Sequence, residues 1–398
     1  MKSFLLPFAA ALCVLAGGIV PLPAAEPKAE PKASAAPKWK NGPPADPGFF
    51  PLGVWLQSPG NAEKYKKAGI NLYVGLWDGP TEEQLAALKK AGMKVICEQN
   101  VVALKHLDDP TITGWMHGDE PDNAQPLPEG KGYGPPILPE KVLGEYVRQQ
   151  TADPTRPVLL NLGQGVAFDK YVGRGVRTNR PEDYPHYMKG GDIVSFDIYP
   201  AVHASPEVSG KLWFVAQGVS RLVEWGQGKK IVWNCLECTR IENLSRKPTP
   251  QEVRAEAWMS ILHGSRGIIW FVHQFKPTFR EAGLLDDGVM LDAVTAVNKE
   301  ITELAPVINA GKDLRGLMVK SADEDAPVVM MGKEYNGKTY VFAVEMRNLK
   351  TTATFKVPGL GNGQKVEVVG ENRTITSANG EFADAFPAWG VRIYRIAK

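Results

Sequence analysis

The sequence predicts an α/β protein, a (β/α)₈ TIM barrel followed by a small all-β sandwich domain. Short runs rich in Val, Ile, Leu, Trp and Tyr alternate with helix-like segments from Phe49 onward. There are eight such runs, the strand number of a closed parallel barrel. After Lys312 the runs become short, alternating and separated by turns, which is typical of antiparallel strands.

The length and composition agree with this fold class. A chain of 398 residues holds a barrel of about 250 residues and a smaller domain. Apolar residues make up 43% and charged residues 23%, as in ordinary soluble globular proteins. The formal net charge of +2 does not favour a nucleic-acid or polybasic membrane binder, so we expect neither as a partner.

The N-terminus has the pattern of a secretory signal peptide, which we place at residues 1–25. Lys2 gives the positive start, an apolar run extends to about Val20, and Ala24 and Ala25 suit a signal peptidase. Residues 26–46 are rich in Pro, Ala and Lys and predict a disordered linker. We therefore expect a secreted or periplasmic protein without stable membrane insertion after signal removal.

The barrel is expected over residues 47–311. Its predicted strands are Leu52–Leu56, Asn71–Leu76, Lys94–Glu98, Ile112–His117, Pro157–Leu162, Asp192–Ile198, Lys230–Asn234 and Gly267–Val272. The clearest predicted helices are Ala62–Ala68, Thr81–Ala91, Pro139–Thr151, Val208–Gly226 and Thr249–His263, with a last helix near Gly288–Ile308. An open doubly wound sheet is the competing fold, but no Gly-rich phosphate turn follows the first strand.

The second domain is expected over residues 312–398. Its predicted strands are Val328–Met331, Thr339–Val344, Thr352–Val357, Lys365–Val369 and Val391–Ile396. Asn336-Gly337 and Asn379-Gly380 are hairpin turn signals.

The active site of a TIM barrel lies at the carboxyl ends of its strands, so the residues there are the candidates. Glu120 follows the fourth predicted strand and Glu237 the seventh, on opposite sides of the mouth. The expected substrate-binding residues around them are Trp55, Trp77, Asp78, Asp119, Asn161, Asp197, Tyr199, Asn234 and Trp270. Carboxylates and amides bind sugar hydroxyls, and indoles stack on the C–H faces of a pyranose. Two carboxylates suffice to hydrolyse a glycosidic bond, one as acid and one as nucleophile.

On these residues the chain resembles the clan of retaining glycoside hydrolases built on (β/α)₈ barrels. The resemblance covers roughly residues 49–309 and is carried by the segments GWMHGDEPDN, VSFDIYP, IVWNCLECT and IIWFVHQF. It implies that Glu120 is the acid/base and Glu237 the nucleophile. It also implies that Tyr199 hydrogen-bonds the nucleophile and that Trp270 forms the sugar platform.

Asp119 departs from the clan, which usually has Asn directly before its acid/base. An Asp-Glu pair in this place resembles the substrate-assisted hexosaminidases, in which the Asp orients the 2-acetamido group of the substrate and the Glu is the acid. In that reading Glu237 only binds substrate. Asp119 capping its own loop is the structural alternative.

Other chemistries have weaker signals. The motif Cys235-x-x-Cys238 has no second half, and no histidine pair at ligand spacing completes a zinc site, so we expect no metal and no cofactor. With Cys97, three cysteines remain after the signal, enough for one disulfide but not for a framework. The sequence thus predicts a secreted retaining glycosidase with a carbohydrate substrate. The alternatives are a substrate-assisted enzyme using Asp119 and Glu120, and a non-catalytic glycan-binding barrel.

Overall fold

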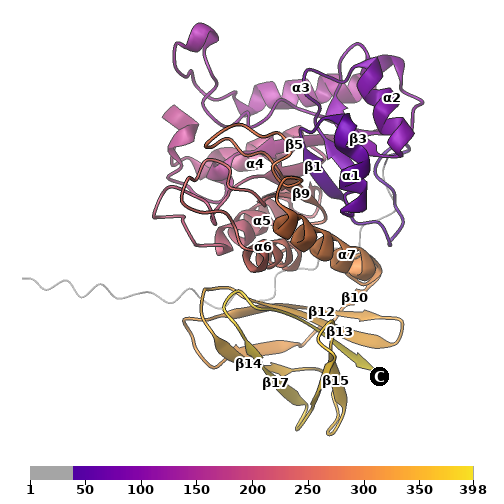
Figure 1. Ribbon diagram of the computed structural model, residues 1–398, viewed down its shortest axis with the longest axis vertical. Coiled ribbons are helices and arrows are strands. Elements are labelled where there is room, and N and C mark those ends of the chain that lie inside the picture. The colour runs from indigo at the N-terminus through magenta and orange to yellow at the C-terminus, as the bar shows by residue number, and fades with distance from the viewer. Residues whose placement is uncertain (1–38, 398) are drawn as a thin grey trace, which may run out of the picture. The chain divides into compact units, whose positions relative to one another are not determined.

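The computed structural model describes residues 39–397, so the predicted signal peptide and most of the predicted linker lie outside the described residues (Figure 1). Parallel strands form a closed barrel in the order β7-β6-β5-β4-β3-β2-β1-β9-β8. The strands are β1 (Leu52–Trp55), β2 (Leu72–Val74), β3 (Lys94–Glu98), β4 (Ile112–Met116), β5 (Val158–Leu162), β6 (Ile193–Phe196), β7 (Ile231–Val232), β8 (Asn234–Glu237) and β9 (Ile268–Phe271). This confirms the predicted TIM barrel.

The seventh barrel strand is divided into β7 and β8 at Trp233. β7 pairs with β6, whereas β8 pairs with β9, so the two halves together close the ring. The Trp233 side chain is buried in the barrel interior, and it fits there because Gly267 has no side chain. A Cβ atom on Gly267 would lie 2.8 Å from the indole.

Alternate residues of the strands point to two different apolar layers. One layer fills the barrel interior and includes Val74, Ile96, Leu159, Cys235 and Ile269. The other lies between the strands and the surrounding helices and includes neighbours in sequence such as Leu236 and Trp270. This division decides which side chains near the strand ends can face the barrel mouth.

The helices of the barrel are α1 (Ala62–Lys67), α2 (Glu82–Ala91), α3 (Pro139–Ala152), α4 (Tyr184–Tyr187), α5 (Trp213–Gly226), α6 (Pro250–Leu262) and α7 (Gly288–Ala310). At α2, Thr81 and Gln84 form a capping box with N···O distances of 3.2 and 2.9 Å, and Gly92 ends the helix at a φ of +65°. The expectation that a helix follows every strand is wrong at β3, after which the chain forms only the 3₁₀ turn Ala103–Lys105.

Two antiparallel sheets follow α7. The larger has the order β10-β12-β13-β18-β15-β16 and the smaller β11-β14-β17. Their strands are β10 (Lys312–Asp313), β11 (Met318–Ser321), β12 (Val328–Tyr335), β13 (Lys338–Glu345), β14 (Thr351–Lys356), β15 (Lys365–Val368), β16 (Arg373–Thr376), β17 (Glu381–Phe386) and β18 (Val391–Ala397). Both Asn-Gly pairs have positive φ at each residue, as hairpin turns of this type need. The predicted all-β sandwich is thereby confirmed.

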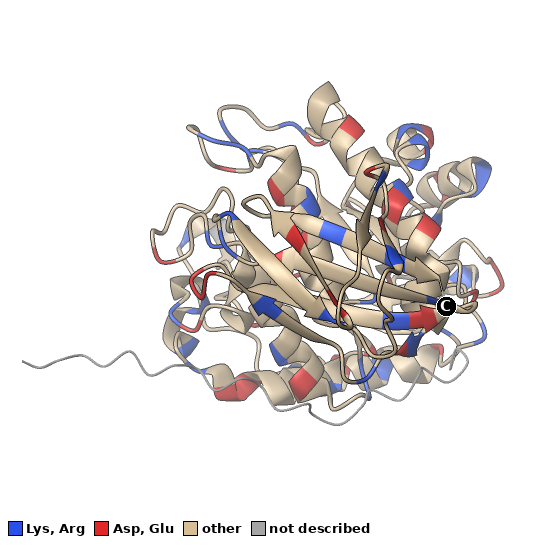
Figure 2. Ribbon diagram, turned by 90° about the horizontal axis from the view of Figure 1, so that it is seen from below, with Lys and Arg blue, Asp and Glu red and all other residues tan. Residues whose placement is uncertain are grey.

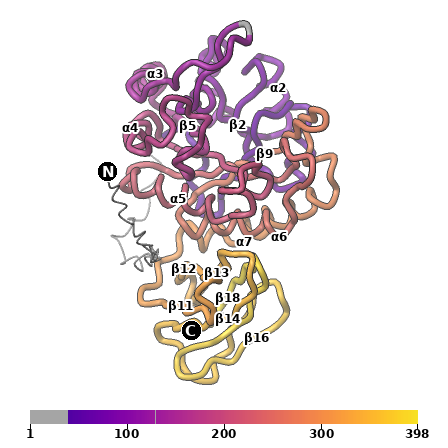
Figure 3. Tube along the Cα trace, turned by 90° about the vertical axis from the view of Figure 1, so that its left-hand side faces the viewer, coloured from indigo at the N-terminus to yellow at the C-terminus, as the bar shows by residue number. Residues whose placement is uncertain are grey.

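The β domain contacts the barrel through α6 and α7, as Figures 1 and 3 show. The ring of Trp258 stacks on Phe342 with 5.4 Å between centroids, and Arg254 donates a hydrogen bond to the carbonyl of Val391. On the face in Figure 2, acidic and basic residues are interspersed. Within residues 39–397, no helix is long and apolar enough to cross a membrane.

Candidate active site

Two acidic side chains meet at the carboxyl ends of the barrel strands. Glu120 follows β4 and Asp197 follows β6, and their carboxyl groups hydrogen-bond each other. A hydrogen bond between two carboxyl groups requires a proton on one of them. The site is therefore built around a shared proton.

Surrounding charges place this proton on Glu120. Burial, and then the negative charges of Asp197 and Asp119, raise the pKa of Glu120 well above its ordinary value. Burial also raises the pKa of Asp197, but hydrogen bonds with Glu120 and Tyr199 lower it again. The raised pKa of Glu120 favours its protonated form, and Asp197 is then the acceptor in the hydrogen bond between them.

The backbone holds Glu120 in an unusual conformation. Its φ is +44°, in the left-handed region that non-glycine residues rarely occupy. The Glu120 carbonyl accepts hydrogen bonds from the Asn123 amide at 3.0 Å and from the Gln125 side chain at 3.2 Å. Such strain is kept where the surrounding contacts impose it, and it occurs most often at functional sites.

Asp119 is fixed by a chain of hydrogen bonds from two neighbouring strands. The Asn161 amide donates to Asp119 Oδ1 at 2.9 Å, and the Ser195 hydroxyl donates to Asn161 Oδ1 at 2.7 Å. Burial and the charge of Asp197 raise the pKa of Asp119 to about 7. Although the residue as a whole is exposed, its carboxyl group lies among neighbouring acids, which reduces the hydration of that group. Three residues predicted for substrate binding, Asp119, Asn161 and Asp197, thus lie together beside Glu120.

Asp122 anchors the loop that carries these two acids. Its carboxylate accepts hydrogen bonds from the Gly163 amide and from the Tyr184 hydroxyl, both at 2.9 Å. The Arg174 guanidinium lies 4.7 Å from the centre of the Tyr184 ring and donates to the Asp122 carbonyl at 3.3 Å. The sequence did not point to this support. Its only signal there was a third acid in the segment after β4, because Arg174 and Tyr184 belong to no strand end.

Glu237 does not join this cluster. Its side chain is 0% exposed, and its two oxygens accept hydrogen bonds from the backbone amides of Ala201 at 2.5 Å and Val202 at 3.0 Å. Its carboxyl also hydrogen-bonds that of Glu256 on α6. The Tyr199 hydroxyl, expected to hydrogen-bond Glu237, lies instead 3.6 Å from Cys235 Sγ and hydrogen-bonds Asp197.

Two further expectations are corrected by the direction of the side chains. The Trp270 indole donates to Asn298 Oδ1 of α7 at 2.9 Å, and Asn234 donates to the Ser260 hydroxyl of α6 at 2.8 Å. Both side chains are buried against the helices, because they occupy the outward positions of β9 and β8. Neither forms part of a sugar platform at the mouth. Trp55 is buried in the barrel interior.

Aromatic rings do border the carboxyl cluster, but they come from other positions. We call Trp77, Phe271, His273, Phe275 and Phe279 the aromatic wall. Phe271 lies 5.0 Å from the Tyr199 ring and 5.1 Å from His273, and His273 lies 5.4 Å from Trp77, as ring-centre distances. Trp77 is 42% exposed and the adjacent Asp78 is exposed as well. The wall therefore runs from the cluster to solvent-exposed indole and phenyl rings.

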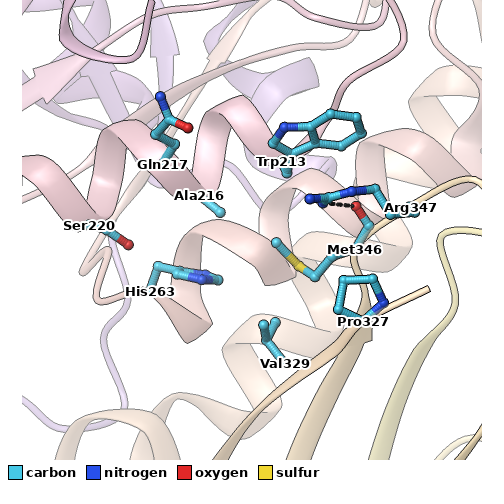
Figure 4. A pocket seen from close by; sticks show the side chains of 9 residues that line it. All are labelled: Trp213, Ala216, Gln217, Ser220, His263, Pro327, Val329, Met346 and Arg347. Carbon is cyan, nitrogen blue, oxygen red and sulfur yellow. Dashed lines mark hydrogen bonds between the residues drawn. The ribbon is translucent and has the colours of Figure 1, made fainter. Parts of the chain in front are cut away.

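Cavities elsewhere in the molecule have a different character. One of about 220 Å³ lies between α5, the end of α6 and the β domain, where Figure 4 shows Arg347 beside Trp213. Another of about 400 Å³ is lined by Cys238 and Thr239, which follow β8, and by Gln274 and Arg280. None of the carboxyl groups of the cluster lines either of them.

Metal and thiol chemistry find no support in the described part of the chain. Among residues 39–397, no group of three His, Cys, Asp or Glu side chains is arranged to hold a metal ion. Cys97, Cys235 and Cys238 are buried and free, so the disulfide that the sequence left open is not formed between them.

No protein-family model matches this sequence, and no curated protein matches it. Solved structures share its fold. A GH42 β-galactosidase from G. stearothermophilus superposes with a TM-score of 0.56 at 8% identity, over 88% of this chain and 98% of that one. AmyP in complex with maltose gives 0.51 at 9% identity, over 88% and 96% of the two chains. A putative α-galactosidase/melibiase from Bacteroides fragilis gives 0.51 at 10% identity, over 88% and 79%. At these identities the likeness concerns the fold, a TIM barrel that solved glycoside hydrolases share over most of this chain.

Proposed function

We propose that this protein hydrolyses O-glycosidic bonds of oligo- or polysaccharides, with Glu120 as the general acid. The observation that carries this proposal is the pair of neighbouring carboxyl groups of Glu120 and Asp197 after β4 and β6, in which the raised pKa of Glu120 favours its protonated form. An acid that stays protonated at neutral pH is what the departing oxygen of a glycoside needs. The fold shared with solved glycoside hydrolases supports the same function.

Asp197 has a defined part in this step. While Glu120 is protonated, Asp197 accepts its hydrogen bond and keeps its charge beside it. When Glu120 gives its proton to the glycosidic oxygen, two negative charges face each other. The same repulsion that raised the pKa of Glu120 then favours its reprotonation by water.

We further propose that the aromatic wall binds the sugar rings. Trp77 presents an exposed indole with the exposed Asp78 next to it, and Asp119 and Asn161 follow or end other strands of the same barrel and can bind sugar hydroxyl groups. Aromatic rings remove apolar C–H surface from water without requiring a fixed hydrogen-bond pattern. This arrangement replaces the platform that the sequence analysis assigned to Trp270.

The position of Glu237 bears on which group attacks the anomeric carbon. A retaining two-carboxylate mechanism needs a nucleophile about 5–5.5 Å from the acid and free to attack the anomeric carbon. Glu237 is enclosed and both its oxygens are engaged by backbone amides. This observation favours the second candidate, a substrate-assisted enzyme acting on 2-acetamido sugars, in which Asp119 orients the acetamido group and Glu120 is the acid.

A panel of aryl glycosides with and without a 2-acetamido group tests both candidates. We expect turnover by the wild type and a loss of at least 100-fold in Glu120→Gln on substrates with poor leaving groups. Glu145→Gln, which changes a partly exposed acid of α3, is the matched control and should retain full activity. Turnover confined to 2-acetamido substrates selects the substrate-assisted route, whereas equal turnover of both kinds selects the two-carboxylate route.

The non-catalytic reading makes a different forecast in the same assay. A glycan-binding barrel would bind oligosaccharides without cleaving them, and Glu120→Gln would bind as the wild type does. We also propose that the chain is exported, because an apolar run to about Val20 is followed by the small residues Ala24 and Ala25. The N-terminal sequence of the protein recovered from outside the cytoplasm tests this.

A further inference from the structure

The loop between β6 and α5 is held by one buried side chain. Asp197 and Tyr199 begin this loop, and the next two amides after Pro200, those of Ala201 and Val202, both donate to the carboxylate of Glu237. Buried amides without a partner are costly, so a carboxylate that accepts from both fixes the backbone here. The acid at the end of β8 therefore holds the segment that presents Asp197 to Glu120.

A second buried acid lies against the first. Glu256 of α6 is 0% exposed, and neither of its carboxyl oxygens accepts a hydrogen bond from any donor in the described part of the chain. Its carboxyl lies against that of Glu237, and a hydrogen bond between the two requires one proton for the two groups. Two buried carboxylates in contact do not both ionise at neutral pH.

The charges around this pair do not replace the proton. Glu252 faces it from the first turn of α6, and its negative charge opposes ionisation. The nearest cation, Arg246, is paired with Glu252. The thiol of Cys238 faces both acids and also the carboxylate of Asp287 at the start of α7. Toward the barrel, Cys235 and Tyr199 hydrogen-bond each other and face Asp197.

We propose that Glu237 and Glu256 form a proton-sharing clamp, in which Glu237 is a positioning residue that holds the β6–α5 loop and thereby Asp197. The clamp loosens when the shared proton is lost. Its catalytic consequence rests on the proposed function, but its effect on stability does not. Burial raises the pKa of Glu237 to about 8 and the pKa of Glu256 well above its ordinary value, so the pair begins to lose protons in mildly alkaline solution.

The sign of the pH effect follows from the raised pKa. A carboxyl whose pKa is near 4.5 in the unfolded chain and about 8 in the folded one stabilises the fold most fully below the lower value. That stabilisation is lost as the pH rises through about 8. Glu256→Gln keeps a donor to Glu237 but removes the carboxyl of Glu256, whose pKa is also raised by burial, so the variant should lose less stability with rising pH.

Thermal unfolding of wild type and Glu256→Gln between pH 5 and 9.5 tests the clamp. We expect the difference between the unfolding midpoints, variant minus wild type, to increase by about 2–4 °C between pH 6 and 9. This increase does not depend on the size of the difference at pH 5. Glu303→Gln, which removes an exposed acid of α7, is the control and should run parallel to the wild type. Asp119 and Glu345 titrate near pH 7 in all three proteins, so only the differences between proteins are compared. A constant difference between Glu256→Gln and wild type across the pH range overturns the clamp.

The role of Glu237 has its own experiment. Hydrogen exchange at the amides of Ala201 and Val202 should be at least 10-fold faster in Glu237→Gln than in the wild type, while amides of the β domain stay unchanged. On an activated aryl glycoside that the wild type cleaves, azide should not restore activity to Glu237→Ala. A glycosyl azide product would make Glu237 the nucleophile and overturn the positioning role. Failure to cleave any glycoside would refute the proposed function and leave the exchange and unfolding results standing.

Discussion

The carboxyl group of Glu120 hydrogen-bonds that of Asp197, so two acids from the ends of β4 and β6 hold one proton between them. The sequence pointed to Glu237 as the partner of Glu120, yet the carboxyl that meets Glu120 comes from the neighbouring side of the barrel. The predictions below follow from this pair and its surroundings.

Asp197→Asn should shift the alkaline limit of activity to lower pH. Asp197 raises the pKa of Glu120 by its charge, and an amide keeps the shape but removes that charge. Glu120 then loses its proton at a lower pH, and the acid is active only while protonated. We expect the upper pKa in the profile of kcat/KM to fall by about 1 unit or more. An unchanged profile would mean that Glu120 is not the titrating acid.

Asp119→Asn separates the two catalytic routes. In a substrate-assisted enzyme this change should lower kcat by about 100-fold or more on 2-acetamido substrates, since it removes the group that orients the internal nucleophile. In a two-carboxylate enzyme Asn is the residue usual at this place in the clan, so activity should be retained. The hydrogen bond from Asn161 can be kept by the new amide oxygen, so the fold should be unaffected.

Trp77→Ala and Trp270→Ala form an informative pair. Trp77 is 42% exposed, so its removal should change the free energy of unfolding by less than about 1 kcal/mol and raise KM about 10-fold. Trp270 is buried against α7 and hydrogen-bonded to Asn298, so its removal should cost about 3–5 kcal/mol of stability. Urea unfolding and steady-state kinetics measure the two effects. If a folded Trp270→Ala variant loses more substrate binding than Trp77→Ala does, Trp270 forms the sugar platform.

Gly267→Ala should destabilise the barrel at its seventh strand. The added Cβ would stand 2.8 Å from the Trp233 ring, which fills the interior between β7 and β9. Overpacking of this kind costs about 1–3 kcal/mol. Gly118→Ala, where a Cβ meets no atom within 4 Å, is the control for urea unfolding. Equal stability of the two variants would contradict the packing of Trp233 described above.

The sequence by itself determined the architecture and singled out Glu120 as the candidate acid. Runs of Val, Ile and Leu of strand length, with capping signals such as Thr81 to Gln84, predicted the barrel, and two Asn-Gly pairs predicted hairpins of the β domain. These are local patterns whose energetics depend on near neighbours in the chain. Glu120 could be selected because the end of a parallel barrel strand has only one place to lie, at the mouth.

Only the tertiary structure decided which acid Glu120 meets and which aromatic rings face the substrate side. Trp270 and Phe271 are adjacent in sequence, and the pleat sends one toward α7 and the other toward Tyr199. The alternation of side chains along β9 could be read from the sequence. Which of the two alternating sets faces the barrel interior was fixed only by the packing of the neighbouring strands. The alternation of side chains along β8 points Glu237 inward. In the structure the amides of Ala201 and Val202 and the carboxyl of Glu256 hold the Glu237 side chain. These three partners are far away in sequence or lie on another element. Partners brought together by the closing of a barrel carry no local signal, because their interaction energy exists only after the strands and helices have packed.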